Sequence, residues 1–456
     1  KVSILYKRYT ELIVIDSKQL YEEYLEQATH SDMIVVPVLS SIYKHPARNK
    51  VCLLYVYLLS NQQEYIFTLN HQESLYTDVK IDEILNNTVY VYSKKKFKYS
   101  YTGKCQLIDL DLIHYFTHNT SININDIEIY DKFDRLYYEF KKINELIPIT
   151  KHYEFANVIS SQMIPLVEQF VTSKPFEYYN ELYIDSFYEI EKNGLYVDYE
   201  MFLDKFGQNG LEQNLTFSEY NMFTTTGRPS NRYSGINYAA LRKDDGCRKS
   251  FVSRHGKSGI LIQFDYDSYH LKLISKLIGY KFPSDENIHT YLGKQFFNTD
   301  TLTKEQYTKS KEISFQQLYG GVRDEYKHID FYNKTSDYIQ QMWYDFKYDG
   351  FVETPLFNRK LHKHFFKDIS GTKLFNYLLQ AFETERNVYI INQLNEYLST
   401  KFTKLVLYTY DSFLLDFNLD DGKETIQEVK RILEQGGMTS GIEIGSDYGT
   451  LQDTNI

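Results

Sequence analysis

Two apolar segments of this chain each end in an aspartate, and this feature most limits how the chain can fold. Residues 260–264 are followed by Asp265, and residues 405–410 are followed by Asp411. Short runs rich in Ile, Leu, Val and Tyr predict buried strands. A fold that makes these strands neighbours brings both carboxylates to one place, where they can hold two divalent ions for phosphoryl transfer. Either aspartate alone would be weak evidence, because Asp is a common turn residue.

Charge is distributed unevenly along the chain. The 456 residues carry a net charge of −10, but residues 224–281 contain 11 Lys and Arg against four Asp, a local charge of +7, and the rest of the chain carries −17. A polyanion is attracted by the local potential and not by the total charge. The pattern predicts a phosphate-binding channel around Asp265, with a solvated basic face as the alternative.

Composition narrows the class of protein. A chain of this length with 42% hydrophobic and 25% charged residues can bury two or three cores, which excludes a disordered or fibrous protein. Cys52, Cys105 and Cys247 are too far apart for a disulfide framework or a zinc site, as expected in a reducing compartment. The longest apolar run, Val51–Leu59, is about half of what a membrane span needs, and no signal peptide is visible. We expect a soluble cytoplasmic protein with no membrane partner.

The chain divides into two regions by its periodicity. Residues 1–175 predict an α/β unit, with strands at 33–39, 51–59, 65–69 and 88–92, helices at 131–145 and 155–170, and Pro165 and Pro175 marking its exit. Residues 176–456 predict helices at 177–206, 303–319, 335–348 and 371–400, and strands at 259–264, 404–410 and 413–417.

The helix expected over residues 303–319 has one chemically distinctive face. Lys304, Lys311, Phe315 and Tyr319 are spaced by seven, four and four residues, so they share that face. A cation one turn before two aromatic rings can hold a triphosphate while its base and sugar stack. An ordinary amphipathic surface helix is the competing interpretation.

Five segments together resemble, in the same order, the motifs of family A DNA polymerases, the bacterial DNA polymerase I type, in a phage version. They are Thr226-Gly227-Arg228 with the basic stretch 245–251, Asp265–Lys272, Lys311–Gly320, Gly350–Thr354 with Arg359, and Asn376 with Gln380 leading to Tyr410-Asp411-Ser412. The resemblance covers about residues 177–456, and the joint order of the segments is more specific than any one of them.

The resemblance implies an α+β, right-hand polymerase fold with a palm (about 176–281 and 351–456), fingers (about 282–350) and a minimal thumb. Residues 1–175 would form a preceding α/β, ribonuclease-H-like, 3′–5′ exonuclease-type domain. The implied activity is template-directed DNA synthesis, adding dNTPs to a primer 3′-OH with two Mg²⁺ ions that Mn²⁺ can replace. The implied partners are primer-template DNA, dNTPs and a processivity or replisome protein, in the cytoplasm of a host cell.

Residue roles follow from the same resemblance. It implies catalytic roles for Asp265, Asp411 and Lys311, and metal binding by Asp265, Asp411 and the backbone carbonyl of Tyr266. The residues implied to contact the nucleotide are Lys311, Phe315, Tyr319, Gly320, His270 and Tyr266. Those implied to contact DNA are Arg228, Asn376, Gln380 and Tyr410.

Several positions depart from the family pattern. His270 replaces a glutamate that helps to exclude ribonucleotides, and Ser412 replaces a third acidic residue. Tyr307 stands where the family has an arginine, so we expect Lys304 to supply that charge. Only residues 199–225 are available for a thumb, which predicts a weak grip on duplex DNA.

The N-terminal domain lacks the carboxylates that proofreading requires. Residues 36–39 of its first strand include no Asp or Glu, and Asp109, Asp111, Asp131 and Asp134 do not have the spacing of a two-metal nuclease site. We therefore expect an inactive exonuclease-like domain.

Three other functions remain open at this stage. A single-subunit RNA polymerase or a reverse transcriptase shares the two-aspartate palm. Asp265-Tyr266-Asp267 also matches the DxD pattern of metal-dependent glycosyltransferases, and a polymerase fold can serve as an inactive scaffold. The helix at 303–319 and Asp411 favour a polymerase over the glycosyltransferase.

Overall fold

The computed structural model describes residues 12–454 except 42–43, 123–134, 137 and 209. The chain forms two compact units, Lys1–Tyr188 and Glu189–Ile456, which we describe separately. None of the described helices combines the length and apolar character needed to cross a bilayer.

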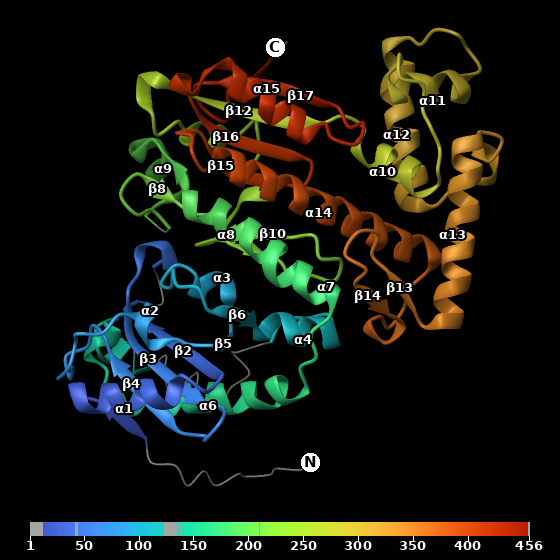
Figure 1. The fold of residues 1–456 in the computed structure, drawn as a ribbon. Helices are drawn as coiled ribbons and strands as arrows, with labels where there is room; N and C mark the ends of the chain where they lie inside the picture. The colour runs from blue at the N-terminus through green and yellow to red at the C-terminus, as the bar shows by residue number, and fades with distance from the viewer. Residues whose placement is uncertain (1–11, 42–43, 123–134, 137, 209, 455–456) are drawn as a thin grey trace. The chain divides into compact units, whose positions relative to one another are not determined.

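The first unit contains a six-stranded sheet in the order β1-β4-β3-β2-β5-β6 (Figure 1). Its strands are β1 (Ile13–Ile15), β2 (Met33–Leu39), β3 (Val51–Leu58), β4 (Glu64–Thr68), β5 (Thr88–Val91) and β6 (Gln106–Asp109). The β2, β3 and β4 strands are antiparallel, whereas β5 and β6 continue parallel to β2. All eight residues of β3 are buried, because an unbroken apolar run suits a strand covered on both faces. The strands at 33–39, 51–59, 65–69 and 88–92 are confirmed.

Helices flank this sheet along the chain. They are α1 (Lys18–Ala28), α2 (Ile81–Ile84), α3 (Lys94–Phe97), α4 (Leu110–His118), α6 (Ile149–Gln169), α7 (Lys174–Glu177), a π-helix (Tyr178–Tyr183) and α8 (Ile184–Asn193), whose last residues belong to the second unit. The helix expected over 131–145, like Asp131 and Asp134, lies partly or wholly outside the described residues.

The helix predicted over residues 155–170 is confirmed, and Pro165 lies inside it. The α6 helix continues through Pro165 and ends at Gln169. Buried residues of α6, among them Ile159 and Met163, hold it in the core, and the helix packs on β2 and β3. An interior proline removes one backbone donor and its ring crowds the carbonyl of residue i−4, and this packing outweighs that cost.

The second unit is built on a five-stranded antiparallel sheet in the order β15-β16-β12-β17-β18. These strands are β12 (Gly259–Tyr266), β15 (Lys404–Thr409), β16 (Ser412–Asn418), β17 (Ser440–Gly445) and β18 (Gln452–Asp453). The strands expected before Asp265 and Asp411 therefore exist and belong to one sheet, with β16 next to β12.

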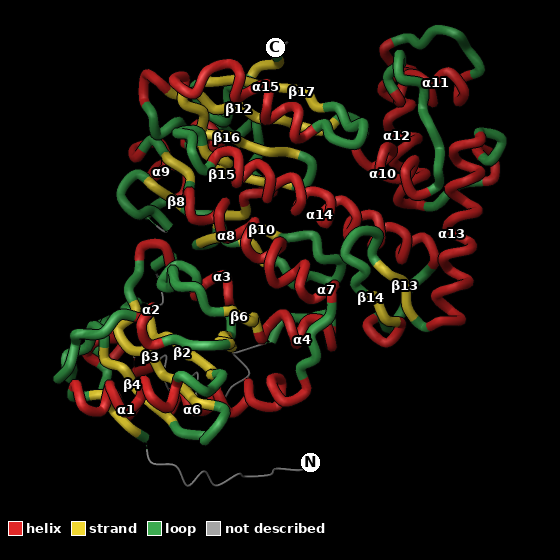
Figure 2. The backbone as a smooth tube through the Cα atoms, viewed as in Figure 1, coloured by secondary structure: helices red, strands yellow, loops and turns green. Residues whose placement is uncertain are grey.

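The longer helices of the second unit, drawn red in Figure 2, accompany this sheet. They are α10 (Tyr269–Leu277), α11 (Ile288–Phe297), α12 (Lys304–Gly320), α13 (Asp330–Asp349), α14 (Gly371–Leu398) and α15 (Gly422–Leu433). The 28-residue α14 packs against α10, α12, α13, α15 and β15, so it is the common support of the unit.

Short elements complete the second unit. They are β7 (Leu195–Tyr196), α9 (Tyr199–Phe206), β8 (Leu215–Thr216), β9 (Tyr220–Asn221), β10 (Ser230–Tyr233), β11 (Ile236–Asn237), β13 (Phe351–Glu353) and β14 (Lys360–His362). The loop from Thr224 to Arg228, which connects β9 to β10, reaches α14 through side-chain contacts.

Candidate active site

The sheet of the second unit places Asp265 and Asp411 on neighbouring strands. Asp265, the penultimate residue of β12, pairs in register with Ser412, the first residue of β16. Asp411 directly precedes Ser412, and its backbone carbonyl accepts a hydrogen bond of 3.0 Å from the backbone N–H of Tyr266. The two aspartates, 146 residues apart in the sequence, therefore meet at one end of the sheet.

A residue with a positive φ angle lies within three residues of each aspartate. Tyr410 and Asp411 form a two-residue turn between β15 and β16, and Tyr410 has a φ of 62°. Ser268, three residues after Asp265, has a φ of 49° at the start of α10. A bulky residue in this conformation carries strain that persists only where its surroundings hold it. Asn387 of α14 does so at Tyr410, donating a hydrogen bond of 2.7 Å to its carbonyl.

Mutual repulsion and loss of water perturb both carboxylates. Partial desolvation raises the pKa of Asp265 to about 7, and the carboxylates of Asp411, Glu443 and Asp267 add to the shift. Desolvation also raises the pKa of Asp411, with a further contribution from Glu383. A concentration of negative charge of this kind favours cation binding.

The α12 helix presents the residues that the sequence assigned to one face. Lys304, Lys311, Phe315 and Tyr319 are exposed, whereas Ser310, Ile313, Ser314, Gln317 and Leu318 on the other side are buried. The rings of Phe315 and Tyr319 are parallel within 5°, with centroids 6.2 Å apart. The ammonium of Lys311 lies 4.7 Å from the centre of the Tyr307 ring. The helix therefore offers a cation and two stacked rings to the solvent.

A cavity of about 200 Å³ lies between α10, α12, α14 and the Tyr410–Asp411 turn. Of the residues singled out in the sequence, Arg228, Tyr266, His270, Phe315, Tyr319 and Asp411 line it. Asp265, Lys311, Gly320, Asn376, Gln380 and Tyr410 lie outside its lining, as does Lys304. The structure thus brings half of the predicted site residues to a single cavity.

His289 and Glu383 also line this cavity, and sequence reasoning missed both. His289, the second residue of α11, is buried, and its Nδ1 has no hydrogen-bond partner among the described residues. Burial lowers the pKa of His289 to about 4, and the charge of Lys311 lowers it further. This places Lys311 near the cavity. A lone histidine at a helix start carries no sequence signal that distinguishes it from a core residue.

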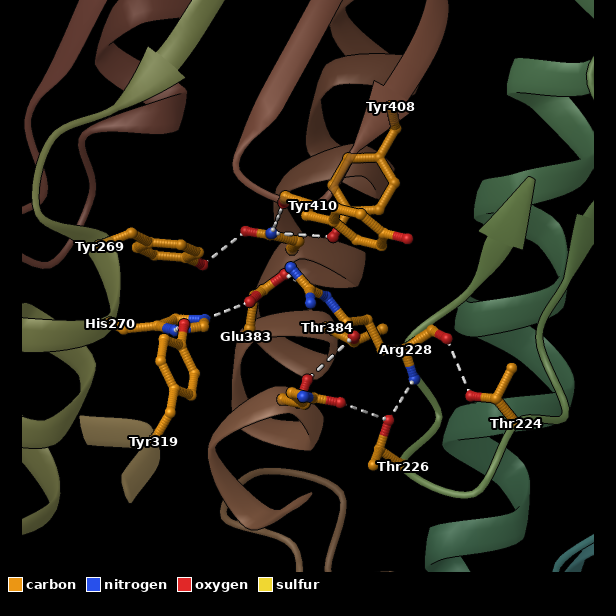
Figure 3. A network of polar contacts seen from close by, with 12 residues as sticks. Thr224, Thr226, Arg228, Tyr269, His270, Tyr319, Glu383, Thr384, Tyr408 and Tyr410 are labelled. Atoms are coloured by element: carbon orange, nitrogen blue, oxygen red, sulfur yellow. Dashed lines mark hydrogen bonds and ion pairs between the residues drawn. The ribbon is translucent and has the colours of Figure 1, made fainter. Parts of the chain in front are cut away.

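Glu383 connects the polar side chains of the cavity (Figure 3). Its carboxylate, 1% exposed, accepts a hydrogen bond of 3.2 Å from Nε of Arg228 and a short one from Nε2 of His270. Since a carboxylate only accepts, Nε2 of His270 carries a proton, and Nδ1 of the same ring is hydrogen-bonded to the Tyr319 hydroxyl at 2.7 Å. The Arg228 guanidinium lies 3.6 Å from the centre of the Tyr410 ring.

The remaining predicted residues have identifiable contacts. Asn376 donates to the backbone carbonyl of Tyr319 at 3.1 Å, and Gln380 accepts from the hydroxyl of Thr226 at 3.1 Å. The side chain of Tyr266 is buried, with its hydroxyl bonded to the Leu433 carbonyl, so only its backbone can serve a ligand. A side-chain atom added at Gly320 would meet nothing within 4 Å.

No protein-family model and no curated protein matches this sequence. Among solved structures, the chain is similar to the POL domain of Pol1 from M. smegmatis, determined in complex with DNA primer-template and dNTP. The TM-score is 0.71 over 96% of this chain and 99% of that chain, at 12% sequence identity. At this identity the similarity establishes the fold. The chain has the predicted α+β, right-hand polymerase fold.

Proposed function

We propose that this chain is a template-directed DNA polymerase of the family A type, which adds dNTPs to a primer 3′-OH. The observation that carries the proposal is the meeting of Asp265 and Asp411 at the end of β12 and β16, beside a cavity lined by Phe315 and Tyr319. The fold similarity supports it, because the matched domain binds primer-template and dNTP. The order of the five sequence segments supports the family A type, and a phage-encoded enzyme of this type would act in the cytoplasm of its host cell.

The residues present fit a pair of divalent ions. Neither Asp265 nor Asp411 has an ion-pair partner within the described ranges, and desolvation, with neighbouring carboxylates, raises the pKa of both. No three Asp, Glu, His or Cys side chains of the described residues form a metal site alone. Mg²⁺ is commonly bound by one or two carboxylates plus substrate phosphates, so two aspartates and the Tyr266 carbonyl suffice. The bound ions would activate the primer oxygen and stabilise the leaving pyrophosphate.

The chain's own residues would orient the nucleotide. Lys311 would neutralise the triphosphate, and Nδ1 of His289, in the tautomer that carries its proton there, would donate a hydrogen bond to it. Phe315 would pack on the sugar and base, with Tyr319 and Gly320 on the template side. Holding the dNTP and the primer 3′-OH in the correct relative orientation increases the rate, because it lowers the entropic cost of bringing the two reactants together.

DNA contacts are assigned to Arg228, in the loop before β10, and to two residues of α14. Arg228, Asn376 and Gln380 would reach the minor groove of the primer terminus, where acceptors common to all base pairs report pairing without reading sequence. Tyr410 would hold Arg228 in place by stacking. The basic segment 224–281 would attract the phosphate backbone, and a processivity protein would compensate for the short thumb.

We further propose that the chain does not proofread. The strand predicted to be the first, residues 33–39, is the second strand of the sheet, because β1 (Ile13–Ile15) precedes it. The sequences of the two strands, IVI and MIVVPVL, contain no carboxylate. Asp109 caps α4, accepting from Leu112 N–H and Lys94 N–H at 2.8 Å each, and Asp111 accepts from Ile122 N–H at 2.6 Å. These described acids are engaged in local structure, which supports a structural role for the first unit.

Primer extension tests the proposal directly. Purified chain is incubated with a primer-template and either dNTPs or rNTPs, with and without Mg²⁺, and extension is expected only with dNTPs and Mg²⁺. Asp265→Ala and Asp411→Ala should abolish extension while primer-template binding persists, whereas Asp368→Ala, at an exposed aspartate in the loop before α14, should extend normally. Extension by either active-site variant near the wild-type rate contradicts the metal assignment, and preference for rNTPs indicates an RNA polymerase.

A further inference from the structure

We propose that Glu383 is a positioning residue that couples the primer side of the active site to its nucleotide side. The proposal rests on the polymerase function proposed above. It concerns a residue whose type and position carry no signal in the sequence, but which the structure places between the two sides (Figure 3).

The two oxygens of Glu383 are committed to different sides of the site. Oε1 accepts from Nε of Arg228, which belongs to the loop that faces the primer. Oε2 accepts from Nε2 of His270, whose other nitrogen is hydrogen-bonded to the hydroxyl of Tyr319 on the nucleotide-binding helix. A continuous chain of hydrogen bonds therefore runs from Arg228 through Glu383 and His270 to Tyr319.

Neighbouring polar residues of α14 do not make this connection. Asn376 contacts α12 through the Tyr319 carbonyl, and Gln380 contacts the primer-side loop through Thr226. Each of these hydrogen bonds joins α14 to one side only, whereas Glu383 holds both sides at once. This difference distinguishes a coupling role for Glu383 from general support of the helix.

Burial makes the two contacts of Glu383 depend on each other. Because Glu383 is only 1% exposed, its carboxylate cannot form hydrogen bonds to water when one partner leaves. The remaining partner must then stabilise the buried negative charge alone. The ring of His270 is stacked on Tyr269 at an interplanar angle of 29°, and this contact limits the directions in which the His270 ring can move. A mismatched terminus that displaces Arg228 would therefore draw His270 toward Glu383 and weaken its bond to Tyr319.

The test compares extension of matched and 3′-mismatched primer-templates. We define discrimination as the ratio of kcat/KM for the next dNTP on the two substrates. Tyr319→Phe removes only the hydroxyl that contacts His270 and leaves Arg228 intact, yet it should reduce discrimination about five- to tenfold. Glu383→Gln should give a similar loss, and the double variant should lose no more than the larger single effect, because both changes interrupt the same chain.

Glu385→Gln is a matched control for loss of a buried carboxylate on α14. Glu385 is 1% exposed and accepts from the backbone N–H groups of Leu356 and Phe357 at 2.9 and 3.1 Å. This variant should lower the unfolding temperature without changing discrimination. If Glu383→Gln does not fold, His270→Ala interrupts the same chain and replaces it in the double variant.

The outcomes separate this inference from the proposed function. Absence of primer extension by the wild-type chain refutes the proposed function itself. Normal extension with unchanged discrimination in Tyr319→Phe refutes the coupling alone. Losses that multiply in the double variant also refute it, because independent effects are then acting.

Discussion

Replacement of Lys311 by alanine should reduce nucleotide incorporation severely, because it removes the ammonium one turn before the rings of Phe315 and Tyr319. In the described part of the chain no carboxylate lies within ion-pair distance of Lys311, and its ammonium instead lies 4.7 Å from the centre of the Tyr307 ring. Its charge is near enough to His289 to lower the pKa of that ring. The ammonium is therefore available to an incoming triphosphate.

The size of the effect follows from the charge and its surroundings. A unit charge about 4 Å from a phosphate charge contributes about 4 kcal/mol at an effective dielectric constant of about 20. Lys311 is exposed, so water and salt reduce this contribution to roughly 2–3 kcal/mol. At about 1.4 kcal/mol for each factor of ten, kcat/KM for the dNTP should fall about 10²-fold.

Single-turnover primer extension at increasing dNTP concentration measures this effect. Lys309→Ala is the matched control, because Lys309 lies on the same helix but pairs with Glu312 at 2.8 Å. It should change kcat/KM less than about twofold, and Lys311→Arg should retain most of the activity. A loss of less than about threefold in Lys311→Ala would refute the reasoning, because the triphosphate would then not lie beside this ammonium.

Four further results are expected. Burial and neighbouring carboxylates place the pKa of Asp265 at about 7 in the fold, above the ordinary value of about 3.9, so its contribution to stability is present at low pH and lost as the pH rises through 7. In metal-free protein Asp265→Asn should therefore raise the unfolding temperature more at pH 8 than at pH 5, and an equal difference at both pH values would contradict the shift. Phe315→Tyr should increase incorporation of dideoxynucleotides relative to dNTPs, as the family resemblance implies, and unchanged incorporation counts against a sugar contact. The double variant Asn376→Ala, Gln380→Ala should lose fidelity, scored by misincorporation, more than it loses primer-template affinity. The purified chain should leave a mismatched 3′ terminus intact in Mg²⁺ or Mn²⁺ without nucleotides, and its removal would show that the nuclease carboxylates were misplaced.

The sequence by itself determined the main elements of the fold. The apolar runs before Asp265 and Asp411 are strands of one sheet, as predicted, because alternating or continuous apolar runs leave few other ways to bury their side chains. The spacing of Lys311, Phe315 and Tyr319 was enough to predict that they share one face of a helix, since helical periodicity is a local property. The helix predicted over 155–170 is present as part of α6 and contains Pro165, because packing of α6 on the sheet offsets the cost of an internal proline.

Only the tertiary structure decided which residues complete the site. Glu383 has one oxygen on Arg228, 155 residues away in the sequence, and the other on His270, 113 residues away. The burial of His289 Nδ1 without a hydrogen-bond partner and the left-handed conformation of Tyr410 likewise depend on residues that are distant in the sequence. Periodicity and spacing describe what a residue does within its own element. The partners of a buried polar group depend on how elements from separate parts of the chain meet, and no local pattern encodes that meeting.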